Sequence, residues 1–405
     1  MSMRPATALP PARPPTSPRE PGAARHGTRR RRVVLTVVGA LVALLVLGAI
    51  AVGTLLGAKG TAVATKVFQG GGSPLQLVAP GAPLRTDAQG RSNILVIGTS
   101  QDDPGHANGP GGQGMWLTDS IQLVSYDQRR ASATMIAIPR DLWVRLPTPC
   151  VVGGEAKINA VYECASGLFS QQQSAVPDYP AVDARGAQAL MRTVSEVTGL
   201  QVQYYVHVDY SVVRQAVDAV GGVNVDIVGD GHPGIFDTNQ DQYGGCPGEQ
   251  VSCRTVYYPR NGVYHLDGAH ALALARARGD ANPRSSLNYG LARGDLDREA
   301  NQQKVMLALA HQAASIGVLA NPVAVSNLLT ALGDNVTTNL STGEAKTLFD
   351  FVRTKGTTGI SSYTLTDPAK PLLRIGWAGP QSVVRPVAGL FDYSAIHSAL
   401  GPLPR

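Results

Sequence analysis

The pattern of apolar and polar residues divides the chain into an irregular N-terminal part and a longer part in which strands and helices alternate. The longest apolar segment, residues 33–58, contains no charged side chain. From Asn93 onward, short apolar runs alternate with segments of helical periodicity. The short runs predict strands at 93–98, 120–127, 131–138, 202–208, 223–228 and 360–366. The helical periodicity predicts helices at 185–199, 209–220, 268–278, 296–317, 321–332 and 342–353.

Strands that alternate with helices favour an α/β fold, and we expect a three-layer α/β/α domain with a mixed central sheet. No internal repeat or change of composition divides residues 91–400, so we expect them to form one domain. Residues 59–90 are rich in Gly, Pro and Ala and are expected to be a linker. Residues 1–32 contain many prolines and few large apolar side chains, which is typical of a disordered tail.

The apolar segment 33–58 has the length and composition of a transmembrane helix. At a rise of about 1.5 Å per residue it is long enough to cross the hydrocarbon core of a bilayer, which is about 30 Å thick. A cleaved signal peptide would have a shorter apolar region and a cleavage site of small residues. Arg29–Arg32 adjoin its N-terminal end, so the positive-inside rule predicts a cytoplasmic tail. We therefore expect a single-pass protein of the plasma membrane, with an extracytoplasmic linker and domain.

The net charge of +6 first suggests a nucleic-acid-binding protein. The basic residues, however, are concentrated in the tail, because residues 1–32 hold eight Arg and a single acidic residue, Glu20. The rest of the chain is close to neutral. The sequence therefore argues against nucleic acid as a partner of the domain.

Four cysteines, Cys150, Cys164, Cys246 and Cys253, all lie in the part that is expected to be exported. An even number of cysteines in an oxidising compartment indicates disulfides. Three pairings are possible, and loop closure favours the near pairs, Cys150 with Cys164 and Cys246 with Cys253. Zinc is the rival interpretation, but neither a C-x-x-C motif nor clustered histidines accompany these cysteines.

Several charged or polar residues stand at the ends of predicted elements among apolar neighbours. They are Asp119 before a strand, Arg140 and Asp141 after one, Lys157, Arg276 and Arg278 at the end of a helix, and Asp295, Arg298 and Gln302 at the start of the longest helix. Taken singly, each has an ordinary explanation in helix capping or the helix dipole. Taken together, the cations suit a ligand that carries phosphate, and an Asp among them suits Mg²⁺ bound to the same phosphates.

The common motifs of hydrolases and nucleotide-binding proteins are absent from the sequence, namely G-x-S-x-G, H-E-x-x-H and the Walker loop. The histidines are scattered along the chain. His207 lies within a predicted strand, and we expect it to be structural.

In the order and spacing of its motifs, the chain resembles the LytR-CpsA-Psr family of cell-wall assembly proteins. The motifs are NILVIG (93–98), TDS (118–120), IPRD (138–141), KIN (157–159), YYVHVDY (204–210), VDAVGGVNVDI (217–227), HLDGAHALALARAR (265–278) and DLDREANQQ (295–303). The resemblance implies a catalytic α/β/α domain on one membrane anchor. It also implies a Mg²⁺-dependent phosphotransferase that moves a glycopolymer, with its proximal phosphate, from a polyprenyl diphosphate to a peptidoglycan hydroxyl.

The resemblance also assigns roles by position in these motifs. The diphosphate would be held by Arg140, Lys157, Arg276, Arg278 and Gln302, with Asn159, Asp295 and Arg298 completing the substrate site. Asp119 would bind Mg²⁺. Asp119 and Asp141 are both candidates for the general base.

Three positions depart from the family pattern. Ser100 stands where the family usually has Asp, and Leu117 and Asn301 stand where it usually has Arg. Asp102 or Asp103 can supply the missing carboxylate to the metal. These departures favour one alternative to the transferase, a weakly catalytic paralogue that binds lipid or wall. A second alternative is a polyprenyl-diphosphate diphosphatase, which would use the same site to hydrolyse the carrier when no acceptor is present.

Overall fold

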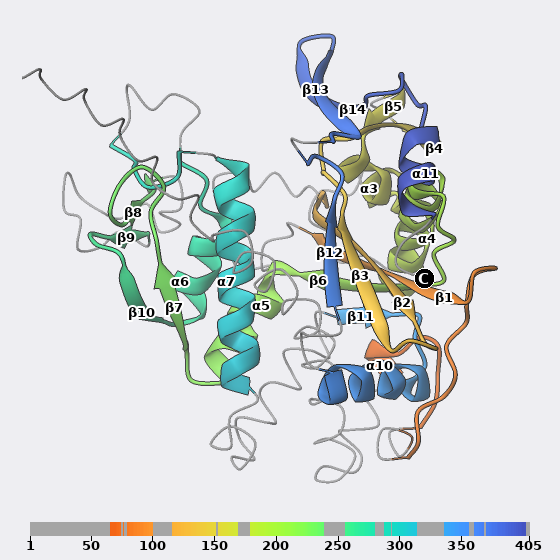
Figure 1. Cartoon of the computed structure of the whole chain (residues 1–405). Helices are drawn as coiled ribbons and strands as arrows, with labels where there is room; N and C mark the ends of the chain where they lie inside the picture. Colours follow the sequence, from red (N-terminus) through yellow and green to blue (C-terminus); the bar gives the residue numbers. More distant parts are fainter. Residues whose placement is uncertain are drawn as a thin grey trace, which may run out of the picture.

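The computed structural model describes twelve parts of the chain (Figure 1). They are residues 65–73, 76, 79–99, 116–150, 153–168, 179–238, 256–279, 287–292, 294–313, 336–355, 360–367 and 370–401. Within these parts, no helix is both long and apolar enough to span a bilayer. The predicted transmembrane helix 33–58, the predicted helix 321–332, and Asp102, Asp103, Cys246 and Cys253 lie outside the described residues.

A six-stranded mixed sheet forms the centre of the fold, in the order β11-β6-β1-β2-β3-β12. Its strands are β1 (Arg91–Thr99), β2 (Thr118–Asp127), β3 (Ser132–Ala137), β6 (Tyr204–Asp209), β11 (Val336–Thr338) and β12 (Ile360–Thr364). β1 runs parallel to β6, and β3 runs parallel to β12, whereas the other neighbours are antiparallel. This confirms the mixed α/β fold with a mixed central sheet.

The central strand β1 is buried along its whole length because both faces of the sheet are covered. Alternate side chains of a strand point to opposite faces, so Ile94 and Val96 join one hydrophobic core and Leu95 and Ile97 join the other. An unbroken apolar run such as NILVIG is typical of such a strand.

Helices cover the sheet and extend beyond it. α3 (Val161–Ser166), α4 (Tyr179–Thr198) and α11 (Ser394–Leu400) contribute to the core that contains Leu95. α10 (Thr342–Lys355) contributes to the core on the other face. Figure 1 shows a further layer beside the sheet, built from α5 (Tyr210–Ala219), α6 (Gly268–Arg276), α7 (Asp295–Ala313) and the β7–β10 ladder (Val223–Ile227 and Gly262–Leu266).

Short elements at the edges complete the fold. They are the β4–β5 pair (Trp143–Cys150 and Gly153–Lys157), the 3-10 turn η2 (Ile158–Ala160), the β8–β9 pair (Ile235–Phe236 and Tyr257–Tyr258) and the β13–β14 hairpin (Leu373–Ala378 and Gln381–Pro386). The sequence analysis predicted none of these. It predicted the strands of the main sheet except β11, and the helices α4, α5, α6, α7 and α10, with ends that differ by a few residues.

The folded part of the chain begins before residue 91. In the segment 59–90, which was expected to be a linker, Val67, Phe68 and Leu84 are buried in the same core as Ile94. Phe68 also forms a β-bridge with Thr338 of β11. The described part of this segment therefore packs against the domain.

Candidate active site

Four of the residues singled out in the sequence form one cluster of ion pairs at an end of the sheet. Arg140 Nη1 lies 2.6 Å from Asp119 Oδ1, and Arg140 Nε lies 3.7 Å from Asp141 Oδ2. Lys157 Nζ lies 2.6 Å from Asp141 Oδ1. We call Asp119, Arg140, Asp141 and Lys157 the ion-pair cluster.

Backbone pairing brings these residues together from separate elements. Asp119 lies near the start of β2, and Arg140 and Asp141 lie in the turn between β3 and β4. Lys157 ends β5, where it pairs with Trp143. The amide of Ile138 donates a hydrogen bond of 3.0 Å to the carbonyl oxygen of Ile121. This bond holds the end of β3 against β2.

Asn159 fixes the cluster through its backbone. Its amide donates to the carbonyl of Arg140 at 3.2 Å, and its carbonyl accepts the hydroxyl of Thr118 at 3.2 Å. Since Thr118 precedes Asp119, these two bonds connect the start of β2, which carries Asp119, to the turn that carries Arg140 and Asp141. Both bonds use the backbone of Asn159, and that its side chain binds substrate stays a prediction.

The cluster is partly accessible, with side-chain exposures between 14% for Asp119 and 29% for Lys157. Two cations and two carboxylates lie in a partly desolvated place, where charges interact more strongly than in bulk water. The guanidinium and the ammonium can bind phosphate oxygens. The carboxylate of Asp119 accepts a hydrogen bond from Arg140 through Oδ1, and a carboxylate is a group that can bind a metal ion or a proton.

A second group of predicted residues lies on α6 and α7. Arg276 ends α6, and Arg278 follows two residues later. The buried carboxylate of Asp237 accepts the backbone amides of Arg278 at 3.0 Å and of Gly279 at 2.9 Å. These bonds hold the chain that leaves α6 in place. Asp237 was missed in the sequence because it stands in a loop without a recognisable motif.

The first turns of α7 bury several polar side chains. Asp297, Arg298 and Asn301 are all buried. Among the described residues, the Nδ2 of Asn301 and the Nε2 of Gln302 are buried and have no hydrogen-bond partner. A buried donor without a partner is costly, so these amides suit a ligand that accepts hydrogen bonds. Asp295 begins the helix, and its side chain is outside the described residues.

The two groups lie on different elements. The ion-pair cluster belongs to the edge of the main sheet and to β4–β5, whereas Arg276, Arg278, Arg298 and Gln302 belong to the layer beside the sheet (Figure 1). The structure brings the members of the ion-pair cluster into contact, and it packs α6 against α7. That both groups bind one diphosphate stays a prediction.

A buried polar network lies next to the ion-pair cluster. The fully buried Asp183 of α4 has Oδ1 2.5 Å from Nδ1 of His207, and Nε2 of His207 lies 2.9 Å from the hydroxyl of Thr99. Tyr162 and Thr337 also donate their hydroxyls to Asp183, at 2.8 and 2.6 Å. Burial alone raises the pKa of Asp183, but the charge of His207 and these hydrogen bonds outweigh it, so the pKa is lowered.

His207 is thus a buried, hydrogen-bonded residue, as expected, but its partner was not foreseen. Asp183 lies 24 residues earlier, in a part of α4 that precedes the predicted start of the helix. The sequence signal that could have identified Asp183 is an acidic residue on the apolar side of an amphipathic helix.

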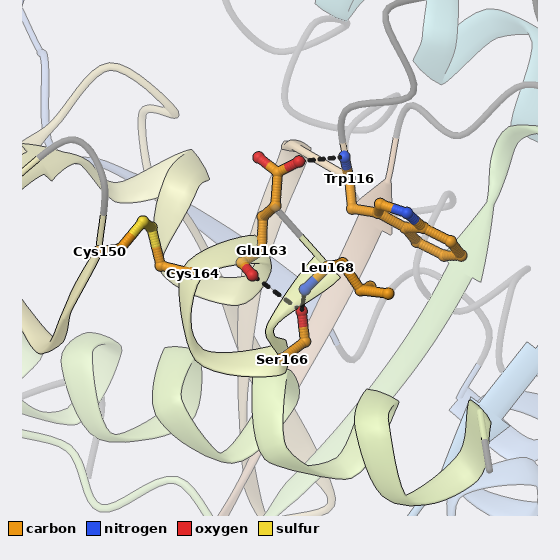
Figure 2. Close-up of a disulfide and its surroundings, with 6 residues drawn as sticks. All are labelled: Trp116, Cys150, Glu163, Cys164, Ser166 and Leu168. Atoms are coloured by element: carbon orange, nitrogen blue, oxygen red, sulfur yellow. Dashed lines mark hydrogen bonds between the residues drawn. A yellow bond between two sulfur atoms is a disulfide. The ribbon is translucent and has the colours of Figure 1, made fainter. Parts of the chain in front are cut away.

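A disulfide joins Cys150, at the end of β4, to Cys164 of α3, with a Cα–Cα distance of 5.5 Å (Figure 2). This confirms the first of the two predicted near pairs. The neighbouring Glu163 is buried and accepts the amide of Trp116 at 3.0 Å. Burial raises the pKa of Glu163 more than this hydrogen bond lowers it. The sequence analysis missed Glu163, which stands between Tyr162 and Cys164 without a motif.

The residues that the structure describes contain no group of three or more His, Cys, Asp and Glu that could hold a metal ion. Mg²⁺, however, is commonly bound by one or two carboxylates together with the phosphates of the substrate. The carboxylate of Asp119, next to cations that suit phosphate, fits this kind of site.

Comparison with known proteins gives a consistent picture. The sequence model of the LytR_cpsA_psr family matches residues 57–374. "Cell wall biosynthesis protein LcpA" of Corynebacterium glutamicum is 28% identical over 288 residues, which cover 67% of this chain and 45% of LcpA. "Polyisoprenyl-teichoic acid--peptidoglycan teichoic acid transferase TagV" of Bacillus subtilis is 26% identical, with 57% of this chain and 47% of TagV covered. The chain thus spans about half the length of these relatives.

A transferase of the same description, TagU of Oceanobacillus iheyensis, is 27% identical, with 63% of this chain and 61% of TagU covered. Among solved structures, the crystal structure of B. subtilis TagV is similar with a TM-score of 0.47 and 22% sequence identity. That comparison covers 78% of this chain and 100% of the TagV chain.

Proposed function

Because this chain belongs to the LytR_cpsA_psr family, we propose that it transfers a cell-wall glycopolymer from a polyprenyl diphosphate to a hydroxyl of peptidoglycan. Two of the relatives described above are named as transferases that join teichoic acid to peptidoglycan. The observation that carries the proposal is the ion-pair cluster, in which two cations and two carboxylates meet at a partly accessible edge of the sheet.

The proposed reaction forms one phosphorus–oxygen bond and breaks another. The acceptor hydroxyl attacks the phosphorus next to the glycopolymer, and the bond from that phosphorus to the bridging oxygen breaks. The hydroxyl proton passes to a carboxylate, for which Asp119 and Asp141 are the candidates. Polyprenyl monophosphate leaves with the electron pair of the broken bond.

The chain's own cations supply the charge that this reaction needs. Arg140 and Lys157 are already held in place by Asp119 and Asp141, so little reorganisation is required when phosphate replaces a carboxylate as their partner. Arg276, Arg278, Arg298 and Gln302 are proposed to contact the rest of the diphosphate. A bound Mg²⁺ would neutralise further charge, with Asp119 as its ligand and Asp102 or Asp103 as candidates for a second.

We also propose that residues 33–58 anchor the protein in the plasma membrane, with the tail in the cytoplasm and the domain outside. The sequence pattern carries this proposal. The disulfide between Cys150 and Cys164 supports it, because disulfides persist in oxidising compartments.

One observation favours a second candidate, a weakly catalytic protein that binds lipid or wall. Asn301 stands where the family usually has Arg, and it is buried. This position therefore lacks the positive charge that an Arg would supply. A site that hydrolyses the carrier without an acceptor, a diphosphatase, would use the same residues.

The experiment is an assay of polyprenyl phosphate release by the full chain in detergent, with lipid-linked glycopolymer as donor. The reaction is run with and without peptidoglycan and with and without Mg²⁺. Release that requires peptidoglycan, with polymer appearing on the wall, supports the transferase. Release of equal rate without peptidoglycan indicates the diphosphatase, and absence of release with retained lipid binding indicates the binding protein.

A further inference from the structure

The β13–β14 hairpin is a feature that the family match does not account for. The match ends at residue 374, whereas the hairpin runs from Leu373 to Pro386. Figure 1 shows it projecting beyond the main sheet, at the end opposite to α10. It therefore presents a surface at one end of the molecule.

Large apolar side chains are exposed on and beside this hairpin. Ile375 is 78% exposed and Trp377 is 65% exposed, and Val387 and Leu390 just after it are also exposed. Ile375 and Trp377 are two residues apart in one strand, so both lie on the same face. An aromatic and an aliphatic side chain that lie together in solvent mark a site of interaction more often than single exposed residues do.

The same hairpin is basic. Arg374 of β13 stands directly opposite Arg385 of β14, and like charges opposite one another destabilise a strand pair. Neither guanidinium forms an ion pair with a described residue. The sequence has no acidic residue from Pro368 to Phe391, and Lys370 adds a third positive charge. Because Arg374 adjoins Ile375 in β13, the two Arg lie on the face of the hairpin opposite to Ile375 and Trp377, and this basic face is complementary to an anion.

The hairpin is also joined to the ion-pair cluster. The amide of Val384 donates to the carbonyl of Asp141 at 2.8 Å, and Val384 forms a β-bridge with Leu142. Leu373 and Val383 are buried, so the base of the hairpin is held by packing while its exposed face stays in solvent. A ligand on the hairpin would therefore lie beside the cluster in a fixed orientation.

We propose that the β13–β14 hairpin is the docking surface for the acceptor, an anionic glycan strand of peptidoglycan. The inference rests on the proposed function and adds to it the place where the acceptor binds. On one face of the hairpin, the indole of Trp377 offers a flat apolar surface for a sugar ring. On the other face, Arg374 and Arg385 offer charge-assisted hydrogen bonds to the carboxylates of the peptide stems.

The position of the hairpin favours the wall over the membrane as its partner. The first described residues lie at the other end of the sheet, where Phe68 bridges to Thr338 and the hydroxyl of Thr342 donates to the carbonyl of Ser73 (Figure 1). Only six residues separate the proposed anchor from Thr65, which span about 20 Å at most. The proposed anchor thus places the membrane near Thr65, and the hairpin at the other end of the sheet points away from the membrane.

The test is co-sedimentation of the full chain in detergent with purified peptidoglycan sacculi, and separately with vesicles of phosphatidylglycerol and phosphatidylcholine. The variants are Trp377→Ala and the double variant Arg374→Ala with Arg385→Ala. The matched control is Val263→Ser, because Val263 is 70% exposed on β10, away from the hairpin. We expect the first two variants to bind sacculi at least about tenfold more weakly, and the control to bind as the unaltered protein does.

The inference is overturned if Trp377→Ala binds sacculi as tightly as the unaltered protein, if the unaltered protein does not bind sacculi, or if the hairpin is needed for vesicles instead. Transfer by the unaltered protein is measured separately. Transfer without a role of Trp377 in sacculus binding refutes this inference alone. Binding through Trp377 without transfer refutes the proposed function alone.

Discussion

His207 Nδ1 lies 2.5 Å from Asp183 Oδ1, at the centre of a buried network that reaches the candidate active site. The network ends at the hydroxyl of Thr99, and Thr99 pairs with Thr118 in the β1–β2 ladder. Thr118 in turn precedes Asp119 of the ion-pair cluster. A contact between α4 and β6 thereby fixes the strand end next to the residues proposed to carry the chemistry.

Replacement of Asp183 by Asn should destabilise the fold. The carboxylate accepts bonds from His207, Tyr162, Tyr205 and Thr337, and an amide cannot accept all of them. We expect a loss of about 3 kcal/mol in the free energy of unfolding, measured by denaturant titration at pH 7. Asp127→Asn, which alters an ion pair with the half-exposed Arg130, is the control and should cost about 1 kcal/mol or less.

The same residue should make stability depend on pH on the acid side. The pKa of Asp183 is lowered in the folded state, so its stabilisation is present above the unfolded value of about 3.9. It is lost as the pH falls through the lower folded-state value. Unfolding free energies measured from pH 6 down to pH 3 should therefore fall more steeply for the unaltered protein than for Asp183→Asn. Parallel curves would contradict this assignment.

The disulfide should contribute to stability. It closes a loop with a sequence separation of 14, for which chain entropy predicts about 3 kcal/mol. The double variant Cys150→Ser with Cys164→Ser should lose about this amount, as measured by denaturant titration. Addition of reductant to that variant should then cause a smaller loss than addition to the unaltered protein. Equal losses would show that this bond does not stabilise the fold.

Gln302 should bind the donor without being needed for the fold. Its buried Nε2 has no hydrogen-bond partner among the residues that the structure describes, so Gln302→Ala removes an N–H group that none of them uses. A hydrogen bond to charged phosphate contributes about 1.5–3 kcal/mol, so we expect about tenfold or greater loss of affinity for lipid-linked donor. The control is Gln312→Ala on the same helix. The Nε2 of Gln312 donates to the carbonyl of Val220, and this variant should bind normally.

The sequence predicted the main sheet because its strands are buried on both faces. NILVIG at 93–98 can only be a central strand or a buried helix, and its length decides for the strand. The β13–β14 hairpin escaped prediction although Gly379-Pro380 marks its turn, because the apolar residues on its exposed face do not follow a core pattern.

For the candidate site, the sequence identified the residues but not their contacts. Asp119, Arg140 and Lys157 stand out singly as charges among apolar neighbours. That Arg140 reaches Asp119 while Lys157 reaches Asp141 depends on the register of β2, β3 and β5, which a single sequence does not reveal. Asp183 and His207 come together only in the folded chain, so no local sequence pattern indicates that they are partners.

The central claim is that the ion-pair cluster carries the phosphotransfer, and one comparison tests it most directly. Polyprenyl phosphate release in the presence of peptidoglycan is measured for Arg140→Ala and for Arg130→Ala. Arg130 also pairs with an aspartate, at 2.6 Å, but lies in the turn between β2 and β3. We predict that Arg140→Ala lowers kcat at least about a hundredfold with the fold intact, and that Arg130→Ala keeps normal turnover. Near-normal turnover of Arg140→Ala would contradict the account.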